Sequence, residues 1–341
     1  MKKIVFAVLA VAVIASCTKN EVLPVNEESQ EITFQTIVGP QTKALGTGQS
    51  EYQGDAFYST AFFLAKDKTW AANSEDAVEY LKDKIIGSGT PNKWEATTSY
   101  YWPKGGKLTF MSYALLDASN VYVDETSSIV AAAKTGLTIS SFDVNGTYKN
   151  HDLLVAAIAS DKDANENVYL TEGVPTLFGH KLCKLAITAQ TNALYSDKTF
   201  AITGITLNKL NHIGTYTMAA NGTESWGTPS GDGDVSYFSG SVTINNDANN
   251  LTVTTIDALQ SVFLPQEFED AETITISYTI TTGSVIENVS VNKKLSEVFG
   301  SGAKWDMNKI YNINLTFGLQ EILWDPAQTD WTDGSDGSVS L

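Results

Sequence analysis

The chain has 341 residues and a formal net charge of −17 at pH 7. A strongly acidic surface repels nucleic acids and anionic lipid surfaces, so neither is an expected partner. Its basic residues other than histidine are all lysines, which excludes the bidentate guanidinium clamps that many phosphate and carboxylate sites use. The length suits two domains better than one.

Residues 1–17, MKKIVFAVLAVAVIASC, combine two lysines, an unbroken apolar run and a small-residue ending. The apolar run is too short to anchor a chain across a bilayer and is typical of a secretory signal. The ending, IASC, resembles a bacterial lipobox. By that resemblance, residues 1–16 are a lipoprotein signal peptide, and diacylglycerol and palmitate on Cys17 tether the protein to the cell outer membrane. The alternative is an ordinary signal peptide that happens to contain a cysteine.

The second cysteine has no partner if Cys17 carries lipid, so no intrachain disulfide can form. The fold must then depend on its hydrophobic core. This second cysteine, Cys183, lies within the strand-like run LCKLAIT, which favours a small buried side chain over a reactive thiol.

Short segments of alternating apolar and polar residues follow one another along the chain, separated by Gly, Asn and Asp clusters. Because they are rich in Val, Ile, Thr, Phe and Tyr, they predict strands. The predicted strands are residues 32–36, 62–65, 107–113, 153–158, 181–189, 201–207, 240–244, 251–256, 261–264, 273–281, 285–291 and 310–317. Only residues 74–84 show helical spacing, with Ser74 as the N-cap. Many short strands with polar turns predict an all-β fold of β-sandwich architecture.

The connecting segments give the expected organisation. Residues 18–30 are polar and acidic and are interpreted as a tether away from the membrane. The polar loop at residues 160–174 is the best candidate for a break between domains. Residues 228–236 and 331–340 are rich in Gly, Ser and Asp and predict flexible loop or tail.

Ten segments agree in order and spacing with one known family. They are the lipobox, ITFQT (32–36), TKA (42–44), YYWP (100–103), KLTFMSYAL (107–115), HDLLVA (151–156), FGHKLCKLAITA (178–189), VFLPQ (262–266), KWDMNKIYNINLTF (304–317) and ILWDPAQTDW (322–331). Together they resemble the Bacteroidales fimbrillins, the major and minor fimbrial subunits and their Mfa-like relatives.

The resemblance implies two tandem transthyretin-like β-sandwich domains, at residues 44–174 and 175–318. A propeptide at residues 17–43 would precede them, and a C-terminal tail at residues 319–341 would follow. Such proteins are made as lipoproteins and assemble into surface fimbriae, or pili, that support cell adhesion. The implied partners are other fimbrial subunits, in a homopolymer or a heteropolymer, and a host or bacterial surface receptor. The implied location is the outer membrane, the cell surface and the fimbrium.

The same resemblance implies that the first strand is removable. Ile32, Phe34 and Thr36 lie on one face of this predicted strand, and a strand with similar side chains could replace it. Removing the strand would leave unpaired strand edges and an apolar groove, which is a template for β-augmentation.

A protease cut after Lys43 would release that strand and leave Ala44 as the new N-terminus. Gly39, Pro40 and Gly46 around this position argue for an exposed loop, where proteolysis is favoured. Some family members carry arginine here, so an arginine-specific protease would fail on this chain. The alternative is that Lys43 is an ordinary surface lysine.

The replacement strand is expected from the C-terminal tail. Ile322, Leu323 and Trp324 form its apolar part and are the candidate donor strand. The alternative is that residues 319–331 are the last strand of the C-terminal domain. A tail with apolar groups favours a shaft subunit, while a tip or anchor subunit stays an alternative.

No enzyme is expected, because no nucleophile, base or metal constellation is visible, and no cofactor is expected either. The three histidines are not spaced as metal ligands. Oxygen donors with calcium-loop spacing form a weak calcium candidate at Asp161, Asp163, Asn165 and Glu172. Because Glu166 replaces the glycine needed for the sharp turn, a solvated polar loop is preferred.

A second function class is a monomeric surface lipoprotein that binds glycans through aromatic side chains. The residues considered for such a platform are Trp70, Trp94, Trp102 and Trp226. Because most tryptophans near strands pack in cores or at edges, this reading ranks below the fimbrial one.

Overall fold

The computed structural model describes residues 30–38, 52–87, 92–124, 128–164, 172–244, 253–300, 302–319 and 321–331. Strands dominate this part of the chain, and α1 (Trp70–Asn73), α3 (Leu295–Val298) and a 3-10 turn at Ser74–Asp76 are each about one turn long. The all-β prediction is therefore confirmed. None of the helices in these ranges has the length and apolar character needed to span a membrane.

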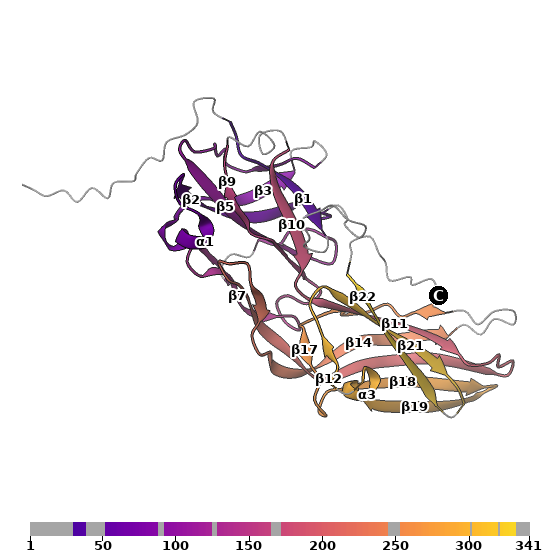
Figure 1. Ribbon diagram of the computed structural model, residues 1–341. Helices are drawn as coiled ribbons and strands as arrows, with labels where there is room; N and C mark the ends of the chain where they lie inside the picture. Colours follow the sequence, from indigo (N-terminus) through magenta and orange to yellow (C-terminus); the bar gives the residue numbers. More distant parts are fainter. Residues whose placement is uncertain are drawn as a thin grey trace, which may run out of the picture.

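The strands divide into an N-terminal and a C-terminal half, stacked lengthwise with β7 crossing between them (Figure 1). The first half in sequence contains β1 (Thr33–Val38), β2 (Ala56–Ala65), β3 (Val78–Gly87), β4 (Trp94–Ala96), β5 (Gly106–Leu116), β6 (Ile129–Ala132), β7 (Gly136–Asp143), β8 (Asp152–Ala156), β9 (Ala159–Lys162) and β10 (Val174–His180). The second contains β11 (Cys183–Thr191), β12 (Lys198–Met218), β13 (Glu224–Trp226), β14 (Ser230–Ile244), β15 (Thr254–Thr255), β16 (Val262–Phe263), β17 (Gln266–Glu267), β18 (Thr273–Thr282), β19 (Val285–Lys294), β20 (Lys304–Trp305), β21 (Lys309–Phe317) and β22 (Ile322–Asp330).

The N-terminal sheet closes on itself. Its strands pair in the order β2–β3–β4–β1–β10–β8–β5, and β5 pairs back to β2, while β9 pairs with β5. The closed ring encloses a core of aromatic and aliphatic side chains. They include Ile32, Phe34, Phe57, Ala61, Ile85, Trp102, Leu108, Phe110, Leu154, Val174 and Phe178. Closure by strand pairing means that each strand of the ring has two neighbours, so removing one of them would open the ring.

The C-terminal half is a sandwich of two sheets. One has the order β15–β11–β21–β22, in which β11 and β21 are parallel. The other has the order β19–β18–β12–β7–β6, with β13 and β14 also paired to β12. The core between them contains Ile187, Phe200, Ile205, Ile276, Trp305, Ile313 and Phe317, among others.

A third core joins the two halves. It contains Met111 and Tyr113 on the outer face of β5, Ile139 on β7, Tyr216 on β12 and Leu264. Because β5 has this core on one side and the ring core on the other, it is buried on both faces, which fits its almost continuous apolar sequence. The hairpin β6–β7 pairs with β12, so a piece of the first half in sequence completes a C-terminal sheet.

Strand pairing therefore divides the chain differently from the sequence-based boundary between residues 174 and 175. Residues of β10 pair with β1 and β8 of the ring, so a division by pairing would fall after His180. It would also assign residues 129–143 to the C-terminal half.

Two local predictions are wrong. The segment 74–84 is not a helix, because β3 begins at Val78 and pairs with β2 over eight residue pairs. The segment 228–236 is not a flexible loop, because β14 begins at Ser230 and pairs with β12. In both cases, pairing with a distant strand outweighs the local sequence preference.

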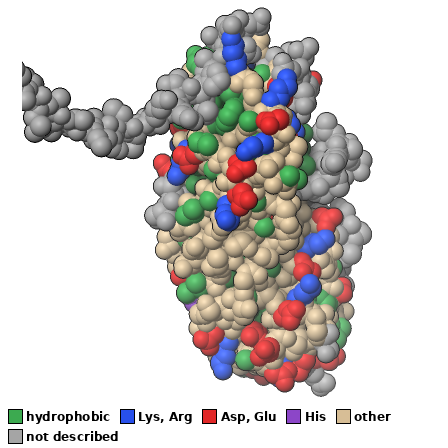
Figure 2. Space-filling view, turned by 60° about the vertical axis from the view of Figure 1, so that its left-hand side comes forward, with side chains coloured by type: hydrophobic (Ala, Val, Ile, Leu, Met, Phe, Trp, Pro, Cys, Tyr) green, Lys and Arg blue, Asp and Glu red, His purple; other side chains and the backbone are tan. Residues whose placement is uncertain are grey.

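Charged side chains of both signs are interspersed on the face of the molecule in Figure 2, and the lysines there do not form a basic patch.

The third core should be necessary for stability. Ile139 is 1% exposed on β7, whereas Val130 is 59% exposed on the neighbouring strand of the same hairpin. We expect Ile139→Ala to lower the free energy of unfolding by about 2–5 kcal/mol, because it leaves a cavity. The matched control Val130→Ala should change it by less than about 0.5 kcal/mol. Urea unfolding of both variants measures the difference, and equal values would show that this core adds little.

Candidate functional site

Strand β1 is held on both sides by backbone pairing. It runs parallel to β10, with registers from Phe34↔Val174 to Val38↔Phe178. Its other side pairs antiparallel with β4 through Thr33 and Phe34. Just before the strand, the Ile32 N–H donates to the Tyr100 carbonyl at 2.8 Å. The first predicted strand is therefore a member of the closed ring.

Side chains of β1 and of the residue before it pack in the ring core. Ile32, Phe34 and Thr36 are each at most 1% exposed. The Phe34 ring makes edge contacts with Phe57 and Phe110, at centroid distances of 5.7 and 5.5 Å. If β1 left, these aromatic partners would line an apolar groove.

Gly173 lies close to the backbone of β1. Its φ of +86° is in the left-handed region, and a Cβ there would lie 2.9–3.0 Å from backbone atoms of Phe34. Gly173, which immediately precedes β10, therefore leaves space that the backbone of β1 occupies and that a larger residue would fill.

The candidate donor segment lies at the start of β22. This strand pairs antiparallel with β21 over nine residue pairs, from Phe317↔Ile322 to Lys309↔Asp330. Ile322 is buried, Leu323 is 52% exposed, and the partly buried Trp324 ring lies 5.5 Å from the Lys293 ammonium. The rest of β22 is exposed, so backbone pairing rather than side-chain burial holds most of it. In this structure the segment is the last strand of its own half, and its donor role stays a prediction.

The end of β22 contacts the end of β10. Trp331 is buried and stacks on the His180 ring, with centroids 4.0 Å apart and planes within 5°. The His180 Nδ1 lies 2.7 Å from an Asp152 carboxylate oxygen at the start of β8. Strand β10 therefore pairs with β1 and, through His180, also contacts Trp331 after the end of β22.

A buried ion pair adjoins this contact. The Lys181 ammonium is 2.9 Å from both carboxylate oxygens of Glu224. Burial lowers the pKa of Lys181, and the Glu224 carboxylate opposes that shift. The Trp226 indole N–H donates to the Lys181 carbonyl at 2.6 Å. These contacts fix the chain where it passes from the ring into the sandwich.

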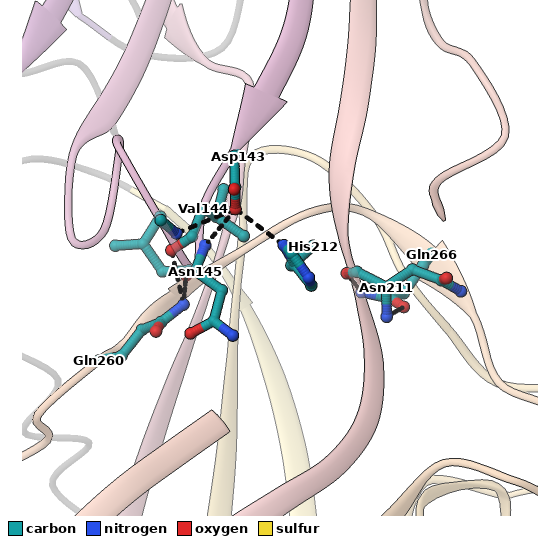
Figure 3. Close-up of polar contacts among 9 residues, drawn as sticks. Asp143, Val144, Asn145, Asn211, His212, Gln260 and Gln266 are labelled. Carbon is teal, nitrogen blue, oxygen red and sulfur yellow. Dashed lines mark hydrogen bonds and ion pairs between the residues drawn. The ribbon is translucent and has the colours of Figure 1, made fainter. Parts of the chain in front are cut away.

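A polar cluster lies around Asp143, the last residue of β7 (Figure 3). The Asp143 carboxylate accepts the Asn145 N–H at 3.0 Å and is 2.8 Å from the His212 Nδ1. The Gln260 amide donates to the Val144 carbonyl at 2.9 Å. These contacts connect the end of β7 to β12 and to the segment around Gln260.

Cys183 is buried as predicted, and burial raises the pKa of its thiol well above the usual value. Its sulfur lies 3.3 Å from the Phe263 carbonyl. The thiol is therefore a packing group.

Several predicted site residues lie outside the described residues, namely Cys17, Lys43, Ala44 and Asn165. Among the other calcium candidates, the Asp161 carboxylate accepts the Trp70 backbone N–H at 2.9 and 3.1 Å. Within the ranges that the structure describes, no three His, Cys, Asp or Glu side chains are grouped so as to hold a metal ion.

The four tryptophans do not form a shared exposed platform. Trp70 is 4% exposed and Trp102 is 0% exposed, so both are core residues. Trp94 and Trp226 are partly buried. The glycan-binding alternative therefore loses the surface on which it depended.

The profile of a family described as fimbrillin-like matches residues 60–331. The chain belongs to this family. The match includes both halves of the fimbrillin-like chain and β22, but it begins after β1. No curated protein matches the chain.

Two crystal structures share the fold of this fimbrillin-like chain. A fimbrial protein from Bacteroides vulgatus gives a TM-score of 0.59 at 15% identity, covering 88% of this chain and 100% of its own. A protein from Bacteroides uniformis described as a cell adhesion protein gives a TM-score of 0.51 at 16% identity, covering 89% and 98%. At such low identities the likeness concerns the fold.

The contact between Gly173 and β1 can be tested with a matched pair of variants. Gly173→Ala and Gly222→Ala meet the same backbone strain, because their φ angles are +86° and +83°, but nothing lies within 4 Å of a Cβ at Gly222. We expect Gly173→Ala to cost about 1–3 kcal/mol more than Gly222→Ala, because only the first overpacks against Phe34. Hydrogen exchange should speed up at the β1 amides in Gly173→Ala alone. Equal stability and equal exchange would contradict the tight seating of β1.

Proposed function

We propose that this fimbrillin-like chain is a structural subunit of surface fimbriae that supports adhesion. It is made as a lipoprotein precursor, is cleaved after Lys43, and polymerises by donor-strand exchange. The observation that carries the proposal is the place of β1, which closes the ring with buried side chains and lies at the end of the chain that cleavage would release.

The energetics favour a joint that assembles only after cleavage. While β1 is in place, the edges of β10 and β4 are paired and the groove is filled. Its loss would expose both edges and the apolar surface around Phe57 and Phe110. A replacement strand would restore the pairing and bury apolar side chains again, each worth roughly 1.5–3 kcal/mol. Such a joint forms between subunits by β-augmentation.

The start of β22 is a suitable donor on two grounds. It offers apolar side chains at alternating positions, Ile322 and Trp324, as β1 does with Ile32 and Phe34. Residues 325–330 of β22 are exposed, so detaching that part from β21 uncovers little apolar surface. Ile322, Trp324 and Trp331 would leave contacts within their own subunit. Its apolar character supports a shaft role over a tip or anchor role.

Cleavage should trigger assembly. We expect a lysine-specific protease to cut the chain lacking residues 1–17 early and after Lys43, giving an N-terminus at Ala44 by mass spectrometry. Denaturing gels run without heating should then show a ladder of multimers that heating removes. The Lys43→Gln chain should stay uncut there and monomeric. A cut product that stays a folded monomer would refute strand exchange and favour a tip subunit.

The donor can be identified with peptides, without altering the fold of the subunit. An excess of a peptide spanning residues 319–331 should occupy the groove of the cleaved subunit and shorten the ladder. The same peptide carrying I322D and W324D should not, because charges cannot replace the apolar side chains in the groove. A peptide spanning residues 30–38 is the positive control. If only that control shortens the ladder, the donor lies elsewhere in the chain.

A further inference from the structure

The long edge strands of the two C-terminal sheets are not alike. On β14 the pairing with β12 carries three register shifts. On β22 the exposed residues include Pro326, Asp325 and Asp330. Bulges, prolines and charges are features that keep an open edge from pairing with another chain.

Strand β19 has neither a bulge nor a proline, although it carries charged residues. It pairs with β18 over ten residue pairs without a register shift, and it contains neither proline nor glycine. Among the described residues no strand pairs with its outer edge, and Figure 1 shows it as the outermost strand of the C-terminal half. Val285 and Ile286 on it are 67% and 62% exposed, more than any other large hydrophobic residue in the described ranges. The strand offers a regular row of unpaired backbone groups next to exposed apolar side chains.

We propose that β19 is a docking strand for a second copy of this chain, which adds its own β19 antiparallel across a two-fold axis at Ser290. The two sheets would then become one continuous sheet. The inference does not rest on strand exchange, because β19 lies in the C-terminal half and takes no part in the ring.

The charges on β19 select both the partner and the register. Within the described residues neither Glu287 nor Lys293 forms an ion pair, although the Lys293 ammonium lies 5.5 Å from the centre of the Trp324 ring in its own subunit. Six positions along a strand, about 20 Å, separate the two residues. In an antiparallel pair centred on Ser290, Glu287 of each copy lies opposite Lys293 of the other. Opposite charges across a strand pair stabilise it, so this register gains two such pairs.

The faces of the strand agree with this register. Val289, Val291 and Lys293 are partly buried on the core side, whereas Ser290 and Asn292 are exposed on the other side. In an antiparallel pair, directly opposed residues point to the same face of the sheet. The core-facing side chains of the two copies would therefore lie on the same face of the joined sheet. Ile286 would lie opposite Lys294, whose methylene chain can cover it.

Engineered cysteines test the axis directly in the chain lacking residues 1–17. Opposed residues in antiparallel strands have Cα atoms about 4.5–5.5 Å apart, which a disulfide can span. We expect Ser290→Cys to form a disulfide-linked dimer under mild oxidation. The matched control Asn288→Cys, on the same face, should not link to itself, because the two copies of that residue would be about 13 Å apart. A mixture of Asn288→Cys and Asn292→Cys chains should link, since these residues are opposed. Equal linking of all single variants, or none, would overturn the register.

Charge reversal tests the partner without a covalent bond. By sedimentation velocity the unaltered chain should show a concentration-dependent dimer. Glu287→Lys and Lys293→Glu should each weaken self-association about tenfold or more, because each places like charges opposite one another twice. Mixed together, the two variants should form a heterodimer, since every opposed pair is then of opposite sign. Thr329→Lys, an exposed substitution on β22, should leave the dimer unchanged. A chain that stays monomeric at high concentration would overturn the proposal.

Discussion

The parallel pairing of β1 with β10 is the contact on which the N-terminal half depends. It supplies the connection that closes the ring, and it brings Phe34 against Phe57 and Phe110 in the ring core. Antiparallel neighbours can be joined by a short turn, but a parallel pair cannot, so this contact links segments far apart in the sequence. One short strand near the start of the chain thereby controls whether a whole core is covered.

Strand β10 contacts both β1 and the C-terminal segment. Its first residues face β1, and its last residue, His180, stacks on Trp331 at the end of β22. Asp152 holds the His180 ring, and the Lys181–Glu224 pair follows at the next residue. The site of the removable strand and the site of the candidate donor strand are thus joined through one strand.

The two proposed contacts between subunits use two different kinds of strand edge. An edge exposed by removing β1 would be new and would lie above an apolar groove, which suits a long-lived joint. The contact proposed at the edge of β19 would rest on backbone groups and two charges on each copy, which suits a weaker and salt-sensitive contact. The first kind would extend a polymer along its length, and the second would join two chains side by side.

The sequence by itself determined the class of the fold, the family and the faces of many strands. Alternation predicted that Ile32, Phe34 and Thr36 share a buried face, and the strand-like context predicted a buried Cys183, because these patterns depend on local side-chain periodicity. Only the tertiary structure decided that the N-terminal sheet closes into a ring, that β6 and β7 complete a C-terminal sheet, and that residues 78–87 form β3 instead of a helix. Each of these depends on a partner strand distant in the chain, and no local pattern specifies which partner a strand will find. The same reason explains why the contact of Trp331 with His180 and the open edge of β19 became visible only in the folded chain.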